Sequence, residues 1–467
     1  MLNGLWLGLI LISILLGGFT GRLEAVTNGA FSAAKDAIIV VALPLAGLMG
    51  LWLGLLRLAE LSGLVESLAR KLHPLMRVLF PEVPAGHPAM GAMVLNMAAN
   101  MLGLGNAATP LGLRAMRCLE TLNPHPGVAT NAMCTFLAIN TSSIQLVPAT
   151  AIAILAAQGS KQPTAILATA LLASAAAASV GILAVKFLQQ LPAFRIRPED
   201  FAAIPASPPN PSTGAAEPET HAVLTSPPKP LTSSSFVLLA VYGGLFLLLT
   251  ALLLLPTWFS PAFDVLHSWG PIFSSFTPPP LPEALQNQAG LPKVLGVLSL
   301  LAVPFLIGFF VLYAAVRGVK VYEEFVNGAK EGWQVALRII PYLTAILVGV
   351  RMFREAGAVE LVAQVLAPVL QPLGVSADLL PLILVRPLSG GATTGLFTEL
   401  VTRFGPDSLI ARTAATIFGS TETTFYVLAV YFGAVGIRKG RHALATGLIA
   451  DATGAIASIA ICRWMFA

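Results

Sequence analysis

Charged residues are scarce in this sequence: Asp, Glu, Lys and Arg make up 10% of its 467 residues, whereas hydrophobic residues make up 56%. A soluble globular protein carries roughly 25% charged residues, so this composition excludes an ordinary soluble domain. Several apolar runs approach the ~20 residues that an α-helix needs to cross a bilayer. We therefore predict an all-α polytopic membrane protein, with the lipid bilayer as its first partner.

Patterns typical of metal and nucleotide chemistry are also missing. The 3 cysteines are scattered without a C-x-x-C spacing, and none of the 6 histidines falls in an H-E-x-x-H pattern. The sequence contains no G-x-x-x-x-G-K-[ST] loop, no nucleophile elbow and no carboxylate dyad. We predict no enzymatic activity, no nucleotide hydrolysis, no cofactor and no metal site.

The net charge of +5 does not indicate a nucleic-acid partner, because positive residues in membrane proteins mostly flank the cytoplasmic ends of the spans. Lys186, Arg195 and Arg197 follow one apolar span, so we predict that the segment after it is cytoplasmic. We predict the N-terminus on the same side of the membrane.

The N-terminal residues 2–18 lack the positive n-region and the small-residue cleavage site of a signal peptide. We interpret them as the first transmembrane helix. A short polar loop at 22–36 would separate this helix from a second span at 37–56.

A change in composition divides the chain. Residues 192–235 are rich in Pro, Ser, Thr and Ala, cannot bury enough apolar surface to fold, and predict a disordered linker. Residues 236–292 would add one span and an aromatic loop that contains no Lys or Arg, which suits the non-cytoplasmic interface. The segments 1–191 and 293–467 remain as two larger units.

Residues 93–113 form a polar stretch inside an apolar region, with Gly103, Gly105 and Pro110 among the polar side chains. Glycine and proline interrupt helical hydrogen bonding and free backbone groups. Within a membrane such groups are tolerated only where they are buried in protein or line a cavity. We therefore predict a broken helix that contributes to a binding site.

The second half of the chain repeats the landmarks of the first in the same order, which predicts an internal duplication. The paired landmarks are a Pro44 helix and a Pro341 helix, 93–113 and 382–400, 140–143 and 420–423, and 164–188 and 443–465. The amphipathic segment 57–79 carries more basic residues than its counterpart, whereas the basic cluster 438–441 precedes only the second copy of the last span. These asymmetries predict inverted repeats, a recurring plan of secondary transporters.

At these residues the chain resembles the spore maturation proteins A and B, which are membrane proteins of the nucleoside-recognition or Gate family. Residues 96–110 are similar to the signature of the A protein, and 386–390 and 419–423 are similar to the B protein. The resemblance implies an A-like Gate repeat at 1–191, a B-like Gate repeat at 293–467, and re-entrant hairpins. It also implies a bacterial inner (plasma) membrane location and a homo-oligomer of unspecified number.

The predicted helix breaks supply the candidate solute-binding side chains. The first repeat offers neutral amides and hydroxyls: Asn96, Asn100, Asn106, Thr109, Asn140, Thr141 and Ser142. The second repeat adds charge: Arg386, Ser389, Thr393, Ser420, Thr421, Glu422 and Thr423. Half-helix N-termini beside such breaks favour anions, and C-termini favour cations.

Each candidate also has a purely structural interpretation. Asn, Ser and Thr beside a break often only cap freed backbone groups. Arg386 and Glu422 either face one another, with solute or proton competing for one of them, or form a permanent buried salt bridge. Asp451, in the last span, is either a cation or proton site or bonds a hairpin end.

We predict a secondary transporter or channel-like protein that binds a small polar solute between the two repeats, with a coupling cation or proton as a further candidate ligand. The alternative is a non-transporting scaffold or accessory protein with a spore-maturation-like role. Transport predicts a cavity that reaches the breaks near Asn106 and Ser420. A scaffold predicts that the side chains at the breaks are fully paired with each other.

Overall fold

The computed structural model describes residues 2–84, 86–102, 105–194, 229–261, 281–286, 289–358, 361 and 376–466. These residues contain many helices and no β-strand, and five helices are long and apolar enough to cross a membrane. The predicted all-α polytopic membrane protein is confirmed. Most of the predicted linker at 192–235 and most of the aromatic loop within 236–292 lie outside the described residues.

The described helices of the first half follow the predicted order of a long helix, two broken helices and an unbroken span. They are α1 (Leu2–Phe19), α2 (Leu23–Asp36), α3 (Leu43–Leu61), α4 (Leu64–Leu79), α5 (Pro88–Met101), α6 (Gly105–Glu120), α7 (Asn131–Thr141), α8 (Ala149–Ala157) and α9 (Ile166–Leu188). Short 3₁₀ turns at Pro163–Ala165 (η2) and Pro192–Phe194 (η3) flank α9.

The second half begins with two added helices and then repeats this order. Its helices are α11 (Ser233–Leu254), α13 (Glu283–Gln286), α14 (Gly290–Val316), α15 (Val321–Glu355), α17 (Leu380–Val385), α18 (Gly390–Phe404), α19 (Leu409–Ser420), α20 (Thr424–Gly433) and α21 (Ala443–Phe466). A 3₁₀ turn, η4 (Ala377–Leu379), precedes α17. The side chains of Ser389 and Ser408 accept hydrogen bonds from backbone N–H groups and thereby cap α18 and α19.

Residues 23–61 form one continuous helical path, so the predicted polar loop at 22–36 was wrong. The segment Ala37–Ala42 between α2 and α3 is π-helical. Pro44 accounts for it, because a proline ring clashes with the carbonyl four residues earlier and a wider π turn relieves that clash. The sequence pattern failed here because α2 is a polar, largely exposed helix rather than a loop.

Helix α3 of the first half crosses helix α15 of the second half at a close approach that glycines permit. A Cβ atom on Gly332 would lie 2.6 Å from the Cα of Gly50, and one on Gly328 would lie 2.5 Å from the carbonyl oxygen of Leu53. Carbon atoms in ordinary contact are about 3.5–4.0 Å apart, so this approach requires glycine. Beside the crossing, Arg57 Nε lies 3.4 Å from Glu324 Oε2.

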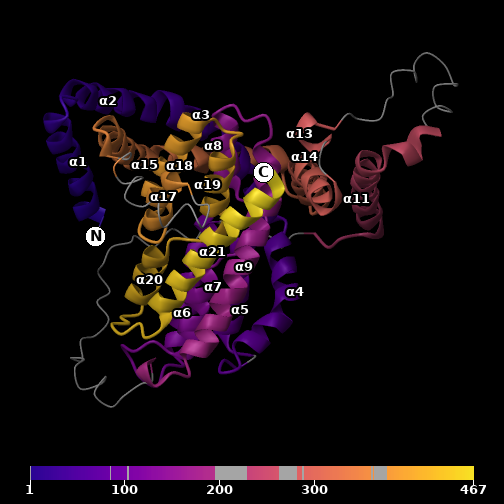
Figure 1. Cartoon of the computed structure of the whole chain (residues 1–467). Helices are drawn as coiled ribbons and strands as arrows, with labels where there is room; N and C mark the ends of the chain where they lie inside the picture. Colours follow the sequence, from indigo (N-terminus) through magenta and orange to yellow (C-terminus); the bar gives the residue numbers. More distant parts are fainter. Residues whose placement is uncertain are drawn as a thin grey trace.

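The unbroken spans α9 and α21 run side by side through the bundle (Figure 1). At one end Arg441 Nε donates to the carbonyl oxygen of Phe194 at 2.8 Å. At the other end Ala165 and Met465 line the same small cavity. The start of each helix therefore lies beside the end of the other, and the two spans are antiparallel.

The helices α11 and α14 lie on the opposite side of the bundle from α1 (Figure 1). The Tyr242 hydroxyl of α11 donates to the carbonyl oxygen of Phe305 of α14 at 2.8 Å. The large apolar side chains of Phe236, Val241 and Leu247 on α11 are exposed. An exposed apolar face of this kind suits contact with lipid, in agreement with the extra span predicted after the linker.

Candidate binding site at the meeting of four helix breaks

The helix pairs α5–α6 and α17–α18 form two hairpins. The base of the first is closed by His87 Nε2 and Thr121 Oγ1, which are 3.5 Å apart. The base of the second is closed by an ion pair between Arg403 Nη1 and Asp378 Oδ1 at 2.8 Å. Each hairpin therefore has both of its outer ends on one side.

The two hairpin bases lie at opposite ends of α9. Leu119, at the base of the first hairpin, lines a cavity together with Gln189, just after α9. At the base of the second hairpin, Thr402 Oγ1 donates to Gln158 Oε1 at 3.3 Å, close to the start of α9. The two hairpins thus enter the bundle from opposite ends.

Between the hairpins, the pairs α7–α8 and α19–α20 are broken helices whose breaks meet. Three backbone hydrogen bonds join the four breaks, from the N–H of Leu146 to the Met101 carbonyl at 2.9 Å, from Glu422 to Thr141 at 2.7 Å, and from Phe425 to Pro387 at 2.9 Å. Unpaired backbone groups in an apolar interior are costly. Each break therefore supplies partners for the groups that another break leaves free.

The amides of the first repeat form a connected chain. Buried Asn96 donates from Nδ2 to the carbonyl oxygen of Ala108 at 2.7 Å, across the turn of the first hairpin. Asn100 donates to Asn140 Oδ1 at 3.0 Å, which links α5 to α7. Asn140 in turn donates to the carbonyl oxygen of Phe136 at 2.9 Å. The side chain of Asn106 lies outside the described residues.

Four of the eight candidate hydroxyls bond their own helices. Ser142 Oγ donates to the Ala138 carbonyl at 2.7 Å, Thr393 Oγ1 to Ser389 at 2.6 Å, and Ser420 Oγ to Ile417 at 3.0 Å. Ser389 Oγ accepts from the backbone N–H of Ala392 at 3.2 Å. For these side chains the geometry agrees with the capping interpretation.

The four remaining hydroxyl candidates are buried or half-buried. Thr141, Thr421 and Thr423 are at most 4% exposed, and Thr423 precedes α20 without capping it through its side chain. Thr109 is half-buried on α6. The structure thus brings most of the predicted residues to one region, although it uses several of them to complete the fold.

Arg386 is the buried charge at the end of α17. It is 5% exposed, its Nη2 donates to the carbonyl oxygen of Phe418 at 2.9 Å, and its guanidinium lies 4.9 Å from the centre of the Phe418 ring. Its Nε makes no hydrogen bond. Glu422 Oε1 instead accepts from Gln145 Nε2 at 2.9 Å. Arg386 and Glu422, both described, form no ion pair within 4.0 Å, so a permanent salt bridge between them is not observed.

Asp451 lies behind the second broken helix, on α21. Its Oδ2 accepts a hydrogen bond of 2.6 Å from Thr424 Oγ1, at the start of α20. Asp451 therefore bonds the start of the second half of a broken helix, which agrees with its interpretation as a residue that bonds a helix end and leaves the alternative of a cation or proton site untested. The sequence signal for this residue was an acidic side chain in the middle of an otherwise unbroken span.

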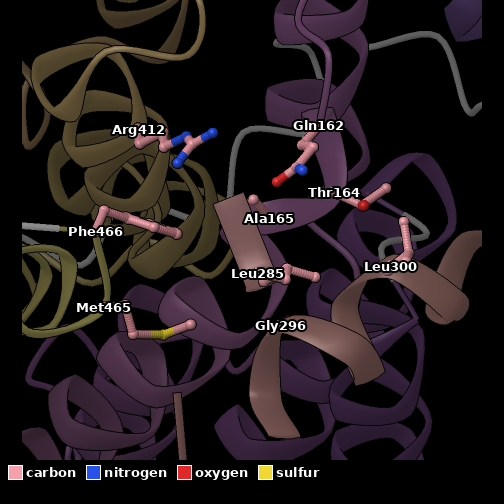
Figure 2. A pocket seen from close by; sticks show the side chains of 9 residues that line it. All are labelled: Gln162, Thr164, Ala165, Leu285, Gly296, Leu300, Arg412, Met465 and Phe466. Carbon is pink, nitrogen blue, oxygen red and sulfur yellow. The ribbon is translucent and has the colours of Figure 1, made fainter. Parts of the chain in front are cut away.

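Neither of two described cavities reaches the meeting of the breaks. One, of about 20 Å³, is lined by Gln162, Arg412 and Phe466 among others (Figure 2) and has room for about one water. The other, of about 510 Å³, lies at the base of the first hairpin and is lined in part by Glu82 and Arg441. We call the arrangement in which the described parts of the breaks are hydrogen-bonded to one another the closed arrangement.

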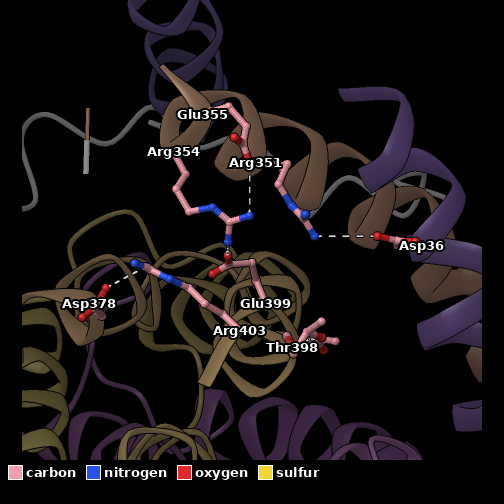
Figure 3. Close-up of polar contacts among 9 residues, drawn as sticks. Asp36, Arg351, Arg354, Glu355, Asp378, Thr398, Glu399 and Arg403 are labelled. Atoms are coloured by element: carbon pink, nitrogen blue, oxygen red, sulfur yellow. Dashed lines mark hydrogen bonds and ion pairs between the residues drawn. The ribbon is translucent and has the colours of Figure 1, made fainter. Parts of the chain in front are cut away.

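A chain of charges, which the sequence did not predict, holds the second hairpin (Figure 3). Arg354 of α15 is ion-paired with Glu399 of α18, whose side chain is 7% exposed, and also lies 3.3 Å from Glu355. Arg351 lies 3.7 Å from Asp36 of α2. These pairs connect the second hairpin to α15, and α15 to α2.

The fold and site define a polytopic α-helical membrane protein of the transporter-like kind, built on two broken-helix hairpins. The family model described as Gate, nucleoside recognition, matches residues 42–188 and 336–438, which together exceed half of the sequence. The chain belongs to this family, as its resemblance predicted.

Spore maturation protein B of Bacillus subtilis (strain 168) is 45% identical over 174 residues, which cover 37% of this chain and 98% of the relative. Spore maturation protein A of the same organism is 42% identical over 174 residues, covering 37% of this chain and 88% of the relative. No solved structure matches the chain.

Proposed function

We propose that this protein is a secondary transporter or channel-like protein that binds a small polar solute where the four helix breaks meet. The observation that carries the proposal is the meeting itself, in which backbone bonds join Met101, Thr141 and Pro387 to breaks on other helices beside the buried Arg386. Discontinuous helices that meet at the membrane midplane are a recurring form of solute site in secondary transporters.

The opposite entry of the two hairpins supports an inverted repeat. The spans α9 and α21 also run in opposite directions, as an inverted repeat requires. Arg441, just before α21, bonds Phe194, just after α9, and Ala165, just before α9, lies near Met465 at the end of α21. An inverted repeat provides two equivalent states that open toward opposite sides of the membrane. In this proposal the closed arrangement is the occluded state between them.

The chemistry of the solute follows from the donors near the breaks. Arg386 Nε and Ser143 Oγ are buried and make no hydrogen bond in the structure. Both can donate, so they suit a solute with carboxylate or carbonyl oxygens, such as an amino acid, a small carboxylate or a nucleobase. The family description, nucleoside recognition, makes nucleosides the first class to test.

Thermal unfolding of the purified protein in detergent tests the proposal. Nucleosides, amino acids and small carboxylates would each be added at millimolar concentration, and a ligand present at 100 times its Kd should stabilise the folded state by about 2.7 kcal/mol. The variant Arg386→Gln should lose this stabilisation. The matched control Arg463→Gln, at an exposed position near the end of α21, should retain it.

The scaffold hypothesis is the second candidate, and the capping bonds of Ser142, Thr393 and Ser420 favour it. A scaffold would leave the breaks permanently paired. It predicts that no compound raises the unfolding temperature and that a cysteine introduced at Ser143 is never labelled by a water-soluble reagent. Stabilisation by one class of solute, abolished by Arg386→Gln, would exclude it.

A further inference from the structure

The broken helix α19–α20 packs directly against α21 on both sides of Asp451. A Cβ atom on Gly447 would lie 2.6 Å from the Thr424 methyl group, and one on Gly454 would lie 2.6 Å from the Thr421 methyl group. Only glycine permits this approach one turn before and one turn after the aspartate. The sequence of α21 therefore presents one carboxylate to the break.

This carboxylate is nearly enclosed and only partly hydrogen-bonded. Asp451 is 8% exposed, its Oδ2 accepts from Thr424 at 2.6 Å, and its Oδ1 makes no hydrogen bond. An ionised carboxylate can accept about four hydrogen bonds. A buried carboxylate that accepts few hydrogen bonds is strongly disfavoured relative to the neutral carboxylic acid.

The surrounding charges do not balance. Among the described residues, Arg386 and Glu422 are the charged groups close enough to Asp451 to influence its charge state. One arginine and two carboxylates leave one excess negative charge when all three are ionised. Half-buried Glu422 has Gln145 as a hydrogen-bond donor, whereas Asp451 has only hydroxyl partners, so Asp451 is the better place for a neutralising proton.

Other charged residues on the helices packed against α21 bind elsewhere. Lys186 of α9 donates to the carbonyl oxygen of Leu79 at 2.9 Å. Arg412 of α19 lies 3.5 Å from Asp407. On α20 the ionisable groups are the phenols of Tyr426 and Tyr431, and on α7 the thiol of Cys134 lies 3.7 Å from the Gly440 carbonyl. None of these groups can replace Arg386 as the cation beside Asp451.

We propose that Asp451 is a proton-binding residue of the transport cycle. Its carboxylate takes up one proton from water in the closed arrangement and returns that proton to water when movement of the second hairpin pairs the carboxylate with the Nε–H of Arg386, which makes no hydrogen bond in the structure. The proposal rests on the proposed function. A proton fits this site better than a metal ion, because a proton needs a single carboxylate oxygen, whereas hard metal cations take about six oxygen ligands and the partners of Asp451 here are the hydroxyls of Thr424 and Thr421.

Infrared difference spectra of the full-length protein, recorded between alkaline and acidic buffer, test this assignment. Exposed carboxylic acids also give a carbonyl stretch on acidification, so the band to follow is the separate high-frequency carbonyl stretch of a buried acid with few hydrogen bonds; it should vanish in Asp451→Asn and remain in Glu422→Gln. If Asp451→Asn does not fold, Asp451→Glu should shift the band and Thr424→Val should also shift it. Loss of the band in Glu422→Gln, or its persistence in Asp451→Asn, would overturn the proposal.

Two further measurements are needed. The first tests whether Asp451 binds a metal ion in place of a proton, and the second tests whether the proton proposal and the transport proposal fail independently. If sodium chloride, compared with choline chloride at equal ionic strength, abolishes the band, the site binds a metal cation and the proton assignment is wrong. If no solute stabilises the protein while Asp451→Asn still removes the band, proton binding stands and the transport proposal fails. If a solute stabilises the protein while the band is insensitive to position 451, the transport proposal stands and the assignment of the proton to Asp451 fails.

Discussion

Substitution of Gly332 by alanine should force α3 and α15 apart. The added Cβ would lie 2.6 Å from both the Cα and the backbone nitrogen of Gly50. Ordinary carbon contacts are about 3.5–4.0 Å, so the helix axes must separate by roughly 1 Å. Backbone atoms cannot rotate away as a flexible side chain can. Overpacking of this kind costs about 1–3 kcal/mol, and we expect the upper part of that range because the clash involves backbone on both sides.

Gly47→Ala is the matched control, because a Cβ there has no atom within 4 Å although Gly47 lies on α3 only one turn from Gly50. Replacing a helical glycine by alanine normally stabilises by roughly 0.5–1 kcal/mol. Unfolding of both variants in the same detergent, followed by circular dichroism, gives the comparison. Equal midpoints for the two variants would refute the close crossing of α3 and α15.

Three further outcomes follow from the described contacts. Glu399→Gln should destabilise the protein by about 3–5 kcal/mol, because it leaves the charge of Arg354 without its buried partner, and Arg354→Met in the same chain should restore part of the unfolding midpoint. Burial, with the positive charges of neighbouring basic groups, lowers the pKa of His442 to about 4 from 6.5, so the folded state holds this ring neutral. The free energy of unfolding that the neutral ring contributes is fully present above pH 6.5 and is lost as the pH falls toward about 4. The variant His442→Leu should therefore lose less stability over this pH range, which thermal melting at several pH values would measure. In a cysteine-free background, Arg438→Cys should be labelled only from the cytoplasm and Lys161→Cys only from outside; labelling of both from one side would contradict the predicted orientation.

The positions of the helix breaks could be predicted from sequence because their cause is local. Of the residues that predicted the first break, Gly105 begins α6, whereas Pro110 lies inside that helix and does not end it; in the second half Pro387 lies in the turn between α17 and α18. The all-α membrane class was equally accessible from composition. The hydrogen-bond partners of the freed backbone groups could not be predicted. The bond from Leu146 to Met101, for example, joins two separate broken helices, and no local sequence pattern encodes their contact.

The roles of individual polar side chains were harder to predict for a related reason. A serine such as Ser142 beside a break has the same sequence environment whether it binds a solute or bonds its own helix at Ala138. The position of Asp451 was visible as an acid in an apolar run. Its contact with Thr424 depends on the approach that Gly447 and Gly454 permit, and that approach exists only in the packed structure.

The two halves of the site differ in how fully their polar groups are used. In the first repeat Asn100 and Asn140 bond each other and the backbone, which fixes that half of the site. In the second repeat the charged groups Arg386 and Asp451 each retain a buried polar atom without a hydrogen bond, whereas beside the described breaks of the first repeat the corresponding group is the neutral hydroxyl of Ser143. A buried polar group without a partner favours any change that supplies one, and leaving a charged group unpaired costs more than leaving a hydroxyl unpaired. If the protein transports a solute as proposed, the second hairpin, which carries Arg386, is therefore the part whose movement would gain most.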